Sequence, residues 1–485
     1  MKLLTLLEQL DYECLNGNVN IEVTDVTNDS RKVKNGSLFI CVRGAIADGH
    51  TFIDEVIEKG AKVLIVEEAT NAPSDVTVIK VANSRYAMAL ISASYFGHPA
   101  NELKVIGVTG TKGKTTTTYM VKSILENAGY KVGLIGTIET IIGDKVIPAT
   151  NTTPESLTVQ QYFREMVDAG CDTVVMEVSS QGLMLDRTAG FTFEIGIFTN
   201  IEPDHIGPSE HDSFEHYLEC KKMLLKQCRL GIVNIDDSHF DEIIAGCTCE
   251  LETFGFGAKA DLRAVDVQLT NEAGVLGVNY QVKGKADFPV ELAMPGEFSV
   301  YNSLTAIAIC LHFNVPIVEI QKALKSASVK GRIEMVKVSD EFTLMIDYAH
   351  NAMSLESILK TLRQYQPKRL VCLFGCGGHR SPDRRYEMGE VSGRLADLSI
   401  ITSDNPRDED PQAIIDYIKE GMAKTAGKYV EIIDRKAAIA YAINNGLPGD
   451  VIILAGKGHE DYQEIKGKKH PMDERIIIQG ILENR

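Results

Sequence analysis

The stretch LKVIGVTGTKGKTT, residues 103–116, decides the fold of this chain. Residues 103–108 form an almost continuous apolar run, as expected of a strand buried on both faces of a sheet. Residues 117–128 then carry apolar side chains at the spacing of one helical face, and Gly129 stands where a helix C-cap belongs. A strand, a glycine turn and a helix in this order predict an α/β fold with an anion site at the start of the helix.

The glycine turn GTKGKTT at 110–116 is typical of a loop that cradles phosphates with backbone N–H groups. In such a loop Lys114 reaches the β- and γ-phosphates of a nucleotide, and the hydroxyl of Thr115 ligates Mg²⁺. The glycines depart from the strict pattern, because Val108 occupies the position of the first one. An ordinary turn between a strand and a helix is the alternative, but the flanking elements favour a nucleotide-triphosphate site.

Length and composition restrict the function further. A chain of 485 residues exceeds what one hydrophobic core usually serves, so we expect two to four domains. The net charge of −17 counts against nucleic acid as a partner and favours small-molecule substrates. No stretch reaches about 18 apolar residues, so none is expected to span a membrane. The ten cysteines include no C-x-x-C pair, which favours reduced thiols in the cytoplasm.

The order of strand-like and helix-like segments predicts three α/β domains. Residues 1–98 contain several β-like runs and a helix, and FGHPAN at 96–101 separates them from the phosphate loop. The central domain is expected to span residues 99–330 around a parallel sheet, with 131–140 as its second strand. In residues 331–485 apolar strands alternate with helices, which predicts a Rossmann-like, doubly wound parallel sheet.

Acidic residues follow the apolar runs of the central domain. Glu177 ends one such run at the carboxyl edge of the sheet, where α/β folds bind ligands, so it can hold Mg²⁺ opposite Lys114. A second run delivers Glu202, Asp204 and His205 to the same edge. The sequence therefore predicts a magnesium site beside the phosphate loop.

Three histidines raise the alternative of a zinc site. His205, His211 and His216 are irregularly spaced and have acidic neighbours, which favours Mg²⁺ or solvent over zinc. Lys221 follows on a helix expected over 216–225, and taken alone it would be a solvated charge.

Five short motifs together resemble the central ATPase domain of the Mur ligase family. In chain order they are GTKGKTT at 110–116, NTTPES at 151–156, MEVSSQGL at 176–183, TNIEPDH at 199–205 and Tyr217-x-x-x-Lys221. Within that family they resemble the ligases that add the third amino acid to the peptidoglycan precursor. The resemblance covers nearly the whole chain and includes DNPR at 404–407.

This resemblance implies ATP and Mg²⁺ as cofactors. Lys221 is implied to be carbamylated by CO₂, so that its carbamate oxygens help to hold a second Mg²⁺. The implied metal ligands are Thr115, Glu177, His205 and carbamylated Lys221, and the implied catalytic residues are Lys114, Glu177, His205 and Lys221. The implied ATP contacts are Gly110, Thr111, Lys112, Gly113, Lys114, Thr115, Thr116, Asn302 and Arg332.

The same resemblance implies two substrate sites. The UDP-muramoyl-dipeptide is implied to contact the loop 43–47 together with Ser30, Asn151, Thr152, Thr153, Ser179 and Arg187. The amino acid is implied to contact Arg385 (or its neighbour Arg384), Asp404, Asn405, Pro406, Arg407, Gly456 and Glu460. Arg407 can grip a carboxylate through two hydrogen bonds. Because meso-diaminopimelate has a distal carboxylate that lysine lacks, we expect meso-diaminopimelate.

The expected reaction is ATP-dependent amide formation on UDP-N-acetylmuramoyl-L-alanyl-D-glutamate. The γ-phosphoryl of ATP activates the D-glutamate side-chain carboxylate as an acyl phosphate, which the amine of the amino acid then attacks. L-Lysine as the third amino acid is the nearest alternative, and a folylpolyglutamate synthase or a nucleotide-switched regulatory ATPase is more distant. We expect a monomer in the cytoplasm without nucleic-acid or membrane partners.

Overall fold

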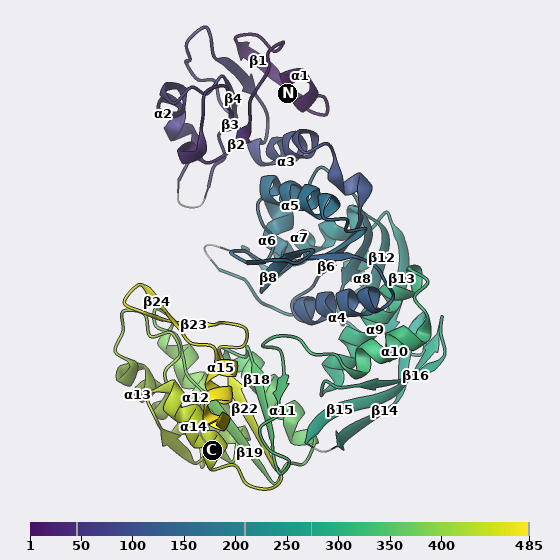
Figure 1. Ribbon diagram of the computed structural model, residues 1–485, viewed down its shortest axis with the longest axis vertical. Coiled ribbons are helices and arrows are strands. Elements are labelled where there is room, and N and C mark those ends of the chain that lie inside the picture. Colours follow the sequence, from purple (N-terminus) through teal and green to yellow (C-terminus); the bar gives the residue numbers. More distant parts are fainter. Residues whose placement is uncertain (45–46, 208–209, 273, 484–485) are drawn as a thin grey trace. The chain divides into compact units, whose positions relative to one another are not determined.

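The computed structural model describes residues 1–44, 47–207, 210–272 and 274–483 (Figure 1). The chain forms two compact units, one of residues 1–261 with 305–315 and one of residues 262–304 with 316–485. Among the described residues, sheets of five, eleven and six strands occupy these units, together with one two-stranded sheet. The domain boundaries at residues 98 and 330 stay predictions.

The N-terminal sheet of the first unit has the strand order β1-β5-β4-β3-β2. Its strands are β1 (Glu13–Asn16), β2 (Val26–Thr27), β3 (Leu38–Ile40), β4 (Val63–Val66) and β5 (Thr77–Lys80). Its helices are α1 (Leu3–Leu6), η1 (Ser30–Lys32), η2 (Gly49–Phe52), α2 (Ile53–Glu58) and α3 (Ser84–Tyr95). Strands β3 and β4 are buried throughout, because their continuous apolar runs lie in the middle of the sheet.

The second sheet of this unit contains the phosphate-loop strand at its centre. In the first unit its order is β13-β12-β11-β6-β10-β7-β8-β9. The strands are β6 (Lys104–Thr109), β7 (Val132–Ile135), β8 (Glu139–Ile142), β9 (Lys145–Pro148), β10 (Thr173–Glu177), β11 (Phe193–Phe198), β12 (Cys228–Asn234) and β13 (Glu250–Gly255). The helices are η3 (Pro99–Glu102), α4 (Lys114–Asn127), α5 (Ser156–Asp168), α6 (Ser180–Met184), α7 (Phe214–Lys226) and α8 (Phe240–Ile244).

The prediction of a second strand in the central domain is wrong, and the observed strands give a sheet that is not entirely parallel. Residues 131–140 do not form a single strand, because the chain turns at 136–138 and β8 returns antiparallel to β7. β9 then pairs antiparallel with β8, while the strands from β13 to β7 are parallel. The central sheet is therefore mixed, with a parallel core that carries the phosphate loop.

The second unit contains an antiparallel group and a parallel sheet. The antiparallel strands are β14 (Leu262–Glu272), β15 (Val275–Gly284) and β16 (Phe288–Leu292). The parallel sheet has the order β17-β18-β22-β19-β20-β21, with β17 antiparallel at its edge. Its strands are β17 (Glu334–Val336), β18 (Thr343–Asp347), β19 (Arg369–Phe374), β20 (Leu398–Ile401), β21 (Tyr429–Glu431) and β22 (Asp450–Ala455).

The remaining elements of the second unit complete a doubly wound arrangement, as expected. They are α10 (Ile317–Lys325), α11 (Ala352–Gln364), α12 (Pro382–Leu395), α13 (Pro411–Met422), α14 (Arg435–Asn444), β23 (Tyr462–Ile465), β24 (Lys468–Pro471) and α15 (Glu474–Glu483). Helix α9 (Glu297–His312) contributes residues to both units. Two apolar clusters, which include Met345 and Ile346 of β18 respectively, contain side chains of alternating orientation from the same strands. Across the described ranges, we find no helix with the length and hydropathy that crossing a membrane requires.

Candidate active site

The phosphate loop connects β6 to α4 through two glycines in the left-handed region. Gly110 has φ 142° and Gly113 has φ 87°. A Cβ on Gly110 would lie 1.9 Å from Thr199 Oγ1, so the close approach of these two segments also requires glycine. The loop thereby directs the N-terminus of α4 toward the carboxyl edge of the sheet, as an anion site requires.

Lys114 folds back over this loop. Its Nζ donates to Gly110 O at 2.8 Å and to Thr111 O at 3.1 Å. The following residues Thr115 and Thr116 are buried in the first turn of α4. The positive charge of Lys114 therefore lies at the loop that the sequence assigns to nucleotide phosphates.

The outer part of the loop is fastened to the end of β11 and to α7. Lys112 N donates to Asn200 Oδ1 at 2.9 Å, and Lys112 Nζ lies 2.6 Å from Glu202 Oε2. Thr111 Oγ1 lies 3.1 Å from the hydroxyl of Tyr217. These contacts join the loop to the end of β11 and to α7.

Glu177 is fully buried at the end of β10, beside the first turn of α4. Its carboxylate accepts hydrogen bonds from Thr115 Oγ1 at 3.0 Å, Thr137 N at 2.8 Å and Thr137 Oγ1 at 3.0 Å. A Cβ on Gly136 would lie 2.5 Å from Glu177 Oε1, so this turn needs glycine to admit the carboxylate. A hydroxyl and a carboxylate side by side are oxygen ligands of the kind Mg²⁺ prefers, so these residues fit that ion.

Lys221 reaches the phosphate loop from α7 and is almost completely buried. Its Nζ donates to Gly110 O at 2.8 Å, the same carbonyl oxygen that accepts from Lys114. Burial, and then the nearby charge of Lys114, lower the pKa of Lys221 well below its usual value. A neutral amine is the form that can react with CO₂, so this environment suits carbamylation.

His205 lies apart from the hydrogen bonds of Glu177 and Lys221. Its side chain is half exposed, its backbone is left-handed with φ 55°, and its Nδ1 lies 2.9 Å from Glu210 Oε1. The loop that carries it follows β11, as expected. The structure thus pairs Thr115 with Glu177 and Lys114 with Lys221, and it places His205 on a separate loop.

The residues expected at the dipeptide gather around the end of β10. Thr153 Oγ1 donates to Glu177 O at 3.0 Å and accepts from Ser179 N at 2.9 Å. Thr152 Oγ1 lies 3.0 Å from Thr137 Oγ1, and Arg187 Nη1 donates to Thr153 O at 3.0 Å. Asn151 is exposed on the turn before α5.

Two further residues join this cluster to the N-terminal sheet. Glu155 pairs with Arg187 at 2.8 Å and with Arg85 of α3 at 3.3 Å. The sequence includes Glu155 only within the motif at 151–156, and it gives no signal for Arg85. Ser30 begins η1, where its carbonyl accepts from Lys59 Nζ at 3.0 Å. In the expected loop 43–47, residues 45–46 lie outside the described residues.

The two predicted ATP contacts at Asn302 and Arg332 both belong to the second unit. Asn302 is buried within α9. The guanidinium of Arg332 lies over the ring of Tyr348, 4.6 Å from its centroid. A planar cation stacked on an aromatic ring leaves its edge available to a polar ligand.

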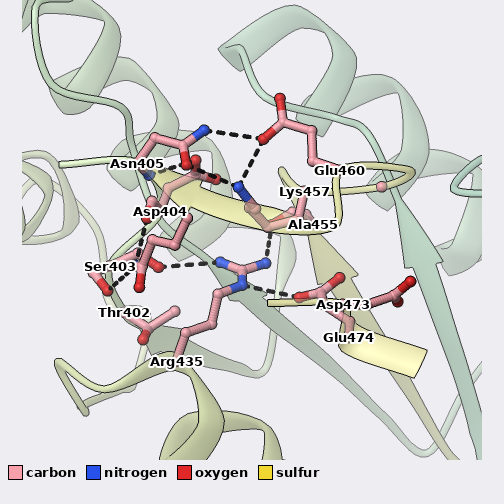
Figure 2. A network of polar contacts seen from close by, with 12 residues as sticks. Thr402, Ser403, Asp404, Asn405, Arg435, Ala455, Lys457, Glu460, Asp473 and Glu474 are labelled. Carbon is pink, nitrogen blue, oxygen red and sulfur yellow. Dashed lines mark hydrogen bonds and ion pairs between the residues drawn. The ribbon is translucent and has the colours of Figure 1, made fainter. Parts of the chain in front are cut away.

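Asp404, Asn405 and Glu460, three of the residues predicted to contact the amino acid, lie close together beyond the ends of β20 and β22 (Figure 2). Asn405 Oδ1 accepts from Lys457 Nζ at 2.9 Å, and Asn405 Nδ2 donates to Glu460 Oε2 at 2.9 Å. Lys457 Nζ also lies 2.7 Å from Glu460 Oε2. A Cβ on Gly456 would lie 2.8 Å from Asp404 Oδ2, which explains a glycine there with φ 110°. Lys457 is fully buried, so its charge interacts with Asn405 and Glu460 and not with solvent.

Arg407 follows Pro406, which is buried, and remains partly exposed. Its Nε donates to Glu464 Oε2 at 3.1 Å, and its Nη1 donates to Gly378 O. The backbone of Arg407 is left-handed, with φ 54°. The guanidinium is therefore oriented by protein contacts before it meets a ligand.

Arg385 is less suited to the amino acid than expected. Its guanidinium is buried and pairs with Glu409 at 2.8 Å. Arg384 instead donates to His350 O at 3.1 Å, at the end of β18. Sequence reasoning did not single out Arg380, which is exposed in the loop after β19.

Arg380 and Arg407 flank Gly377. A Cβ built on Gly377 would lie 3.3 Å from Arg407 Nη1 and 3.8 Å from Arg380 Cγ. The rule that ligands bind at the carboxyl ends of strands would have singled out Arg380, because it ends the loop GCGGHR, 375–380, that directly follows β19.

A buried ion pair lies beneath these loops. Arg435 Nε donates to Glu474 Oε1 at 2.9 Å, and both side chains are fully buried. Arg435 also donates to Ala455 O at 2.9 Å and to Ser403 O at 3.4 Å (Figure 2). One guanidinium therefore links the end of β22 to the loop that follows β20.

Replacing Arg435 with methionine should destabilise the chain by about 3–5 kcal/mol, because one partner of a buried ion pair is removed. Denaturant titration followed by circular dichroism measures this free energy. The control is Lys283→Met, which breaks an exposed pair with Asp287 and should leave the titration unchanged. Equal stability of Arg435→Met and the unmodified chain would contradict the proposed structural role.

Comparisons with known proteins cover the whole chain. Residues 22–104 match the family described as Mur ligase family, catalytic domain. Residues 108–310 match the Mur ligase middle domain, and residues 331–458 match the Mur ligase, glutamate ligase domain. The first match covers most of the N-terminal sheet, the second runs from the end of β6 to β16 and most of α9, and the third covers the parallel sheet of the second unit.

Full-length relatives agree with these matches. The chain is 41% identical to the UDP-N-acetylmuramoyl-L-alanyl-D-glutamate--2,6-diaminopimelate ligase of Clostridium perfringens, covering 100% of both chains. It is 43% identical to ligase 1 of the same name from Clostridium acetobutylicum, covering 99% of this chain and 98% of that one. A solved structure of a ligase of this name has a TM-score of 0.71 at 27% identity, covering 95% of each chain. The chain therefore belongs to the Mur ligase family.

Proposed function

We propose that this chain is an ATP-dependent ligase that joins meso-diaminopimelate to UDP-N-acetylmuramoyl-L-alanyl-D-glutamate. The observation that carries the chemistry is the meeting of Lys114 and Lys221 at one carbonyl oxygen of the phosphate loop. The names of the full-length relatives support the substrates. Arg407, held at the end of the amino-acid loop, supports an amino acid with a second carboxylate.

The first step transfers the γ-phosphoryl of ATP to the side-chain carboxylate of D-glutamate. A carboxylate oxygen attacks the γ-phosphorus, the bond to the bridging oxygen breaks, and ADP leaves. Lys114 stabilises the charge of the phosphoryl group in flight. Thr115 and Glu177 would hold Mg²⁺, which supplies further charge stabilisation when bound, and we assign His205 and carbamylated Lys221 to a second ion.

The second step forms the amide. The neutral amine of the amino acid attacks the acyl carbon, and the tetrahedral intermediate collapses with loss of inorganic phosphate. We assign Thr152, Thr153, Ser179 and Arg187 to the dipeptide, because they surround the end of β10. We assign the orientation of the amino acid to Arg407, Asn405 and Glu460. In this assignment Glu460 binds the distal ammonium group of the amino acid.

Three alternatives are distinguished by their substrates. L-Lysine lacks the second carboxylate that Arg407 would bind. A folylpolyglutamate synthase begins near its phosphate loop, whereas residues 22–104 here match a Mur ligase domain. A nucleotide-switched ATPase would hydrolyse ATP without an acyl acceptor. The monomeric state and the cytoplasmic location stay predictions.

The test of the function compares amino acids directly. Purified chain is incubated with ATP, Mg²⁺ and UDP-N-acetylmuramoyl-L-alanyl-D-glutamate, and phosphate release is followed with meso-diaminopimelate or L-lysine. The proposal predicts release that requires the nucleotide sugar and is faster with meso-diaminopimelate. Faster release with L-lysine would overturn the specificity, and release without any acyl acceptor would favour the switch.

Replacing Arg407 with alanine should raise the KM for meso-diaminopimelate by roughly 10- to 100-fold, the value of a hydrogen bond to a charged group. The KM for ATP should stay unchanged. Initial rates at varied concentrations of each substrate measure both constants. The control is Arg394→Ala, an arginine on the exposed side of α12. Equal loss of both affinities in Arg407→Ala would contradict its assignment.

A further inference from the structure

The start of α7 carries metal-binding side chains that the proposed reaction does not use. His211, His216 and Cys220 each offer one ligand atom, and these atoms lie within 4.8 Å of one another. His216 and Cys220 are four residues apart on α7, so they lie on one face of the helix. His211 lies before the helix, with its ring centroid 5.1 Å from that of His216.

His211 provides the independent observation that points to a ligand. Its side chain is fully buried, and its Nε2 lies 2.8 Å from the hydroxyl oxygen of Ser180 on α6. Its other ring nitrogen, Nδ1, is buried and has no hydrogen-bond partner among the described residues. A buried polar atom without a partner is costly unless something else binds it.

The hydrogen bond to Ser180 is also compatible with the form of the ring that a metal needs. With Nε2–H donating to Ser180 Oγ, Nδ1 carries a free lone pair. Metal-bound histidines characteristically donate their other ring N–H to a neighbouring oxygen in this way. In that form, His211 can bind a metal through Nδ1 while Ser180 accepts from Nε2–H.

The ligand set selects the class of ion. Imidazole nitrogen and thiolate sulfur bind Zn²⁺ and similar ions, whereas Mg²⁺ prefers oxygen. We propose that His211, His216 and Cys220 form a binding site for a thiophilic divalent cation of the Zn²⁺ class. This site is separate from the oxygen ligands at Thr115 and Glu177. His216 is partly exposed, so solvent can supply a fourth ligand.

A cation at this site would tie two segments that carry proposed catalytic residues. His211 lies between His205 and the N-cap Ser213 of α7, and Cys220 directly precedes Lys221 on that helix. Binding would therefore restrain the loop against the helix. The proposed site differs from the set of three histidines considered from the sequence. In the structure Cys220 lies near His211 and His216, whereas His205 contacts Glu210.

Cobalt provides a spectroscopic test that does not depend on activity. The reduced, metal-free full chain is titrated with Co²⁺ in excess Mg²⁺, which occupies oxygen sites. A thiolate ligand gives a charge-transfer band in the near ultraviolet, and we expect this band to saturate at one equivalent. Zn²⁺ should then displace Co²⁺ and abolish the band.

Matched variants identify the ligands. Cys220→Ser should lose the band, and His216→Ala should weaken Co²⁺ binding by roughly tenfold or more. Cys14→Ser, at an exposed thiol, should keep the band. Far-ultraviolet circular dichroism of each metal-free variant verifies folding. If Cys220→Ser does not fold, His216→Ala still tests the site, because it changes a partly exposed side chain. Absence of the band in the unmodified chain, or its persistence in folded Cys220→Ser, would overturn the proposal.

Discussion

Replacing Lys114 with methionine should lower kcat for ligation by about 10³-fold. Two carbonyl oxygens of the phosphate loop, at Gly110 and Thr111, hold the Nζ of Lys114 in place. Because charge shifts within the phosphoryl group during transfer, a fixed cation stabilises the transition state more than bound ATP. Nucleotide affinity should fall less than kcat, since the backbone N–H groups of the loop remain.

The measurement is ADP formation at saturating substrates, together with nucleotide binding by calorimetry. Lys145→Met is the matched control, because Lys145 lies on β9 of the same sheet and is largely exposed. This variant should retain the activity of the unmodified chain. A kcat for Lys114→Met equal to that of the control would remove Lys114 from the reaction.

Replacing Lys221 with methionine should lower kcat by about 10²- to 10³-fold and abolish any dependence on dissolved CO₂. The carbamate forms when the Nζ lone pair attacks the carbon of CO₂ and a proton is released. Burial beside Lys114 lowers the pKa of Lys221, so the reactive neutral amine is populated more than in a solvated lysine. Carbamylation would therefore convert a lysine cation to an anion at the phosphate loop.

The readout is the rate in buffer depleted of CO₂, followed by addition of bicarbonate. The unmodified chain should slow on depletion and recover, whereas Lys221→Met should respond to neither treatment. Lys226→Met, at an exposed lysine on the same helix, should behave as the unmodified chain does. If the unmodified chain kept its full rate after exhaustive depletion, the carbamate would be excluded.

Local patterns predicted the phosphate loop and its strands well. The apolar run at 103–108 became β6, and the glycines at 110 and 113 adopt the left-handed region that the turn requires. Asp410 caps α13 and Pro411 lies in its first turn, where helix-start preferences place these residue types. These features depend on interactions close in sequence, which a single chain displays directly.

Features that depend on contacts between residues far apart in sequence were harder to predict. The turn at 136–138 contains neither proline nor an Asn-Gly pair. The need for glycine at position 136 becomes clear only from the structure, where the Glu177 carboxylate occupies the space beside it. Arg384 and Arg385 are adjacent in sequence, and only the packing of α12 decides that Arg385 meets Glu409. Long-range partners of this kind leave no periodic signal.

The site residues divide in the same way. Lys114 and Thr115 follow from the glycine-loop pattern and Glu177 from the strand-end rule, and the structure brings them to one edge of the sheet. The shared carbonyl of Lys114 and Lys221 depends on α7 packing against the loop, so the resemblance pointed to Lys221 where spacing alone could not. Lys457 and Arg435 support the amino-acid loops from inside the core and have no signature in the sequence.

Isotope transfer tests the central claim, that ATP activates the substrate carboxylate as an acyl phosphate. The side-chain carboxylate of D-glutamate in UDP-N-acetylmuramoyl-L-alanyl-D-glutamate is labelled with ¹⁸O in both oxygens. The chain then turns over with ATP and meso-diaminopimelate, and the released phosphate is analysed by mass spectrometry. The account predicts one ¹⁸O in each phosphate formed with an amide bond. Amide formation with unlabelled phosphate would contradict it.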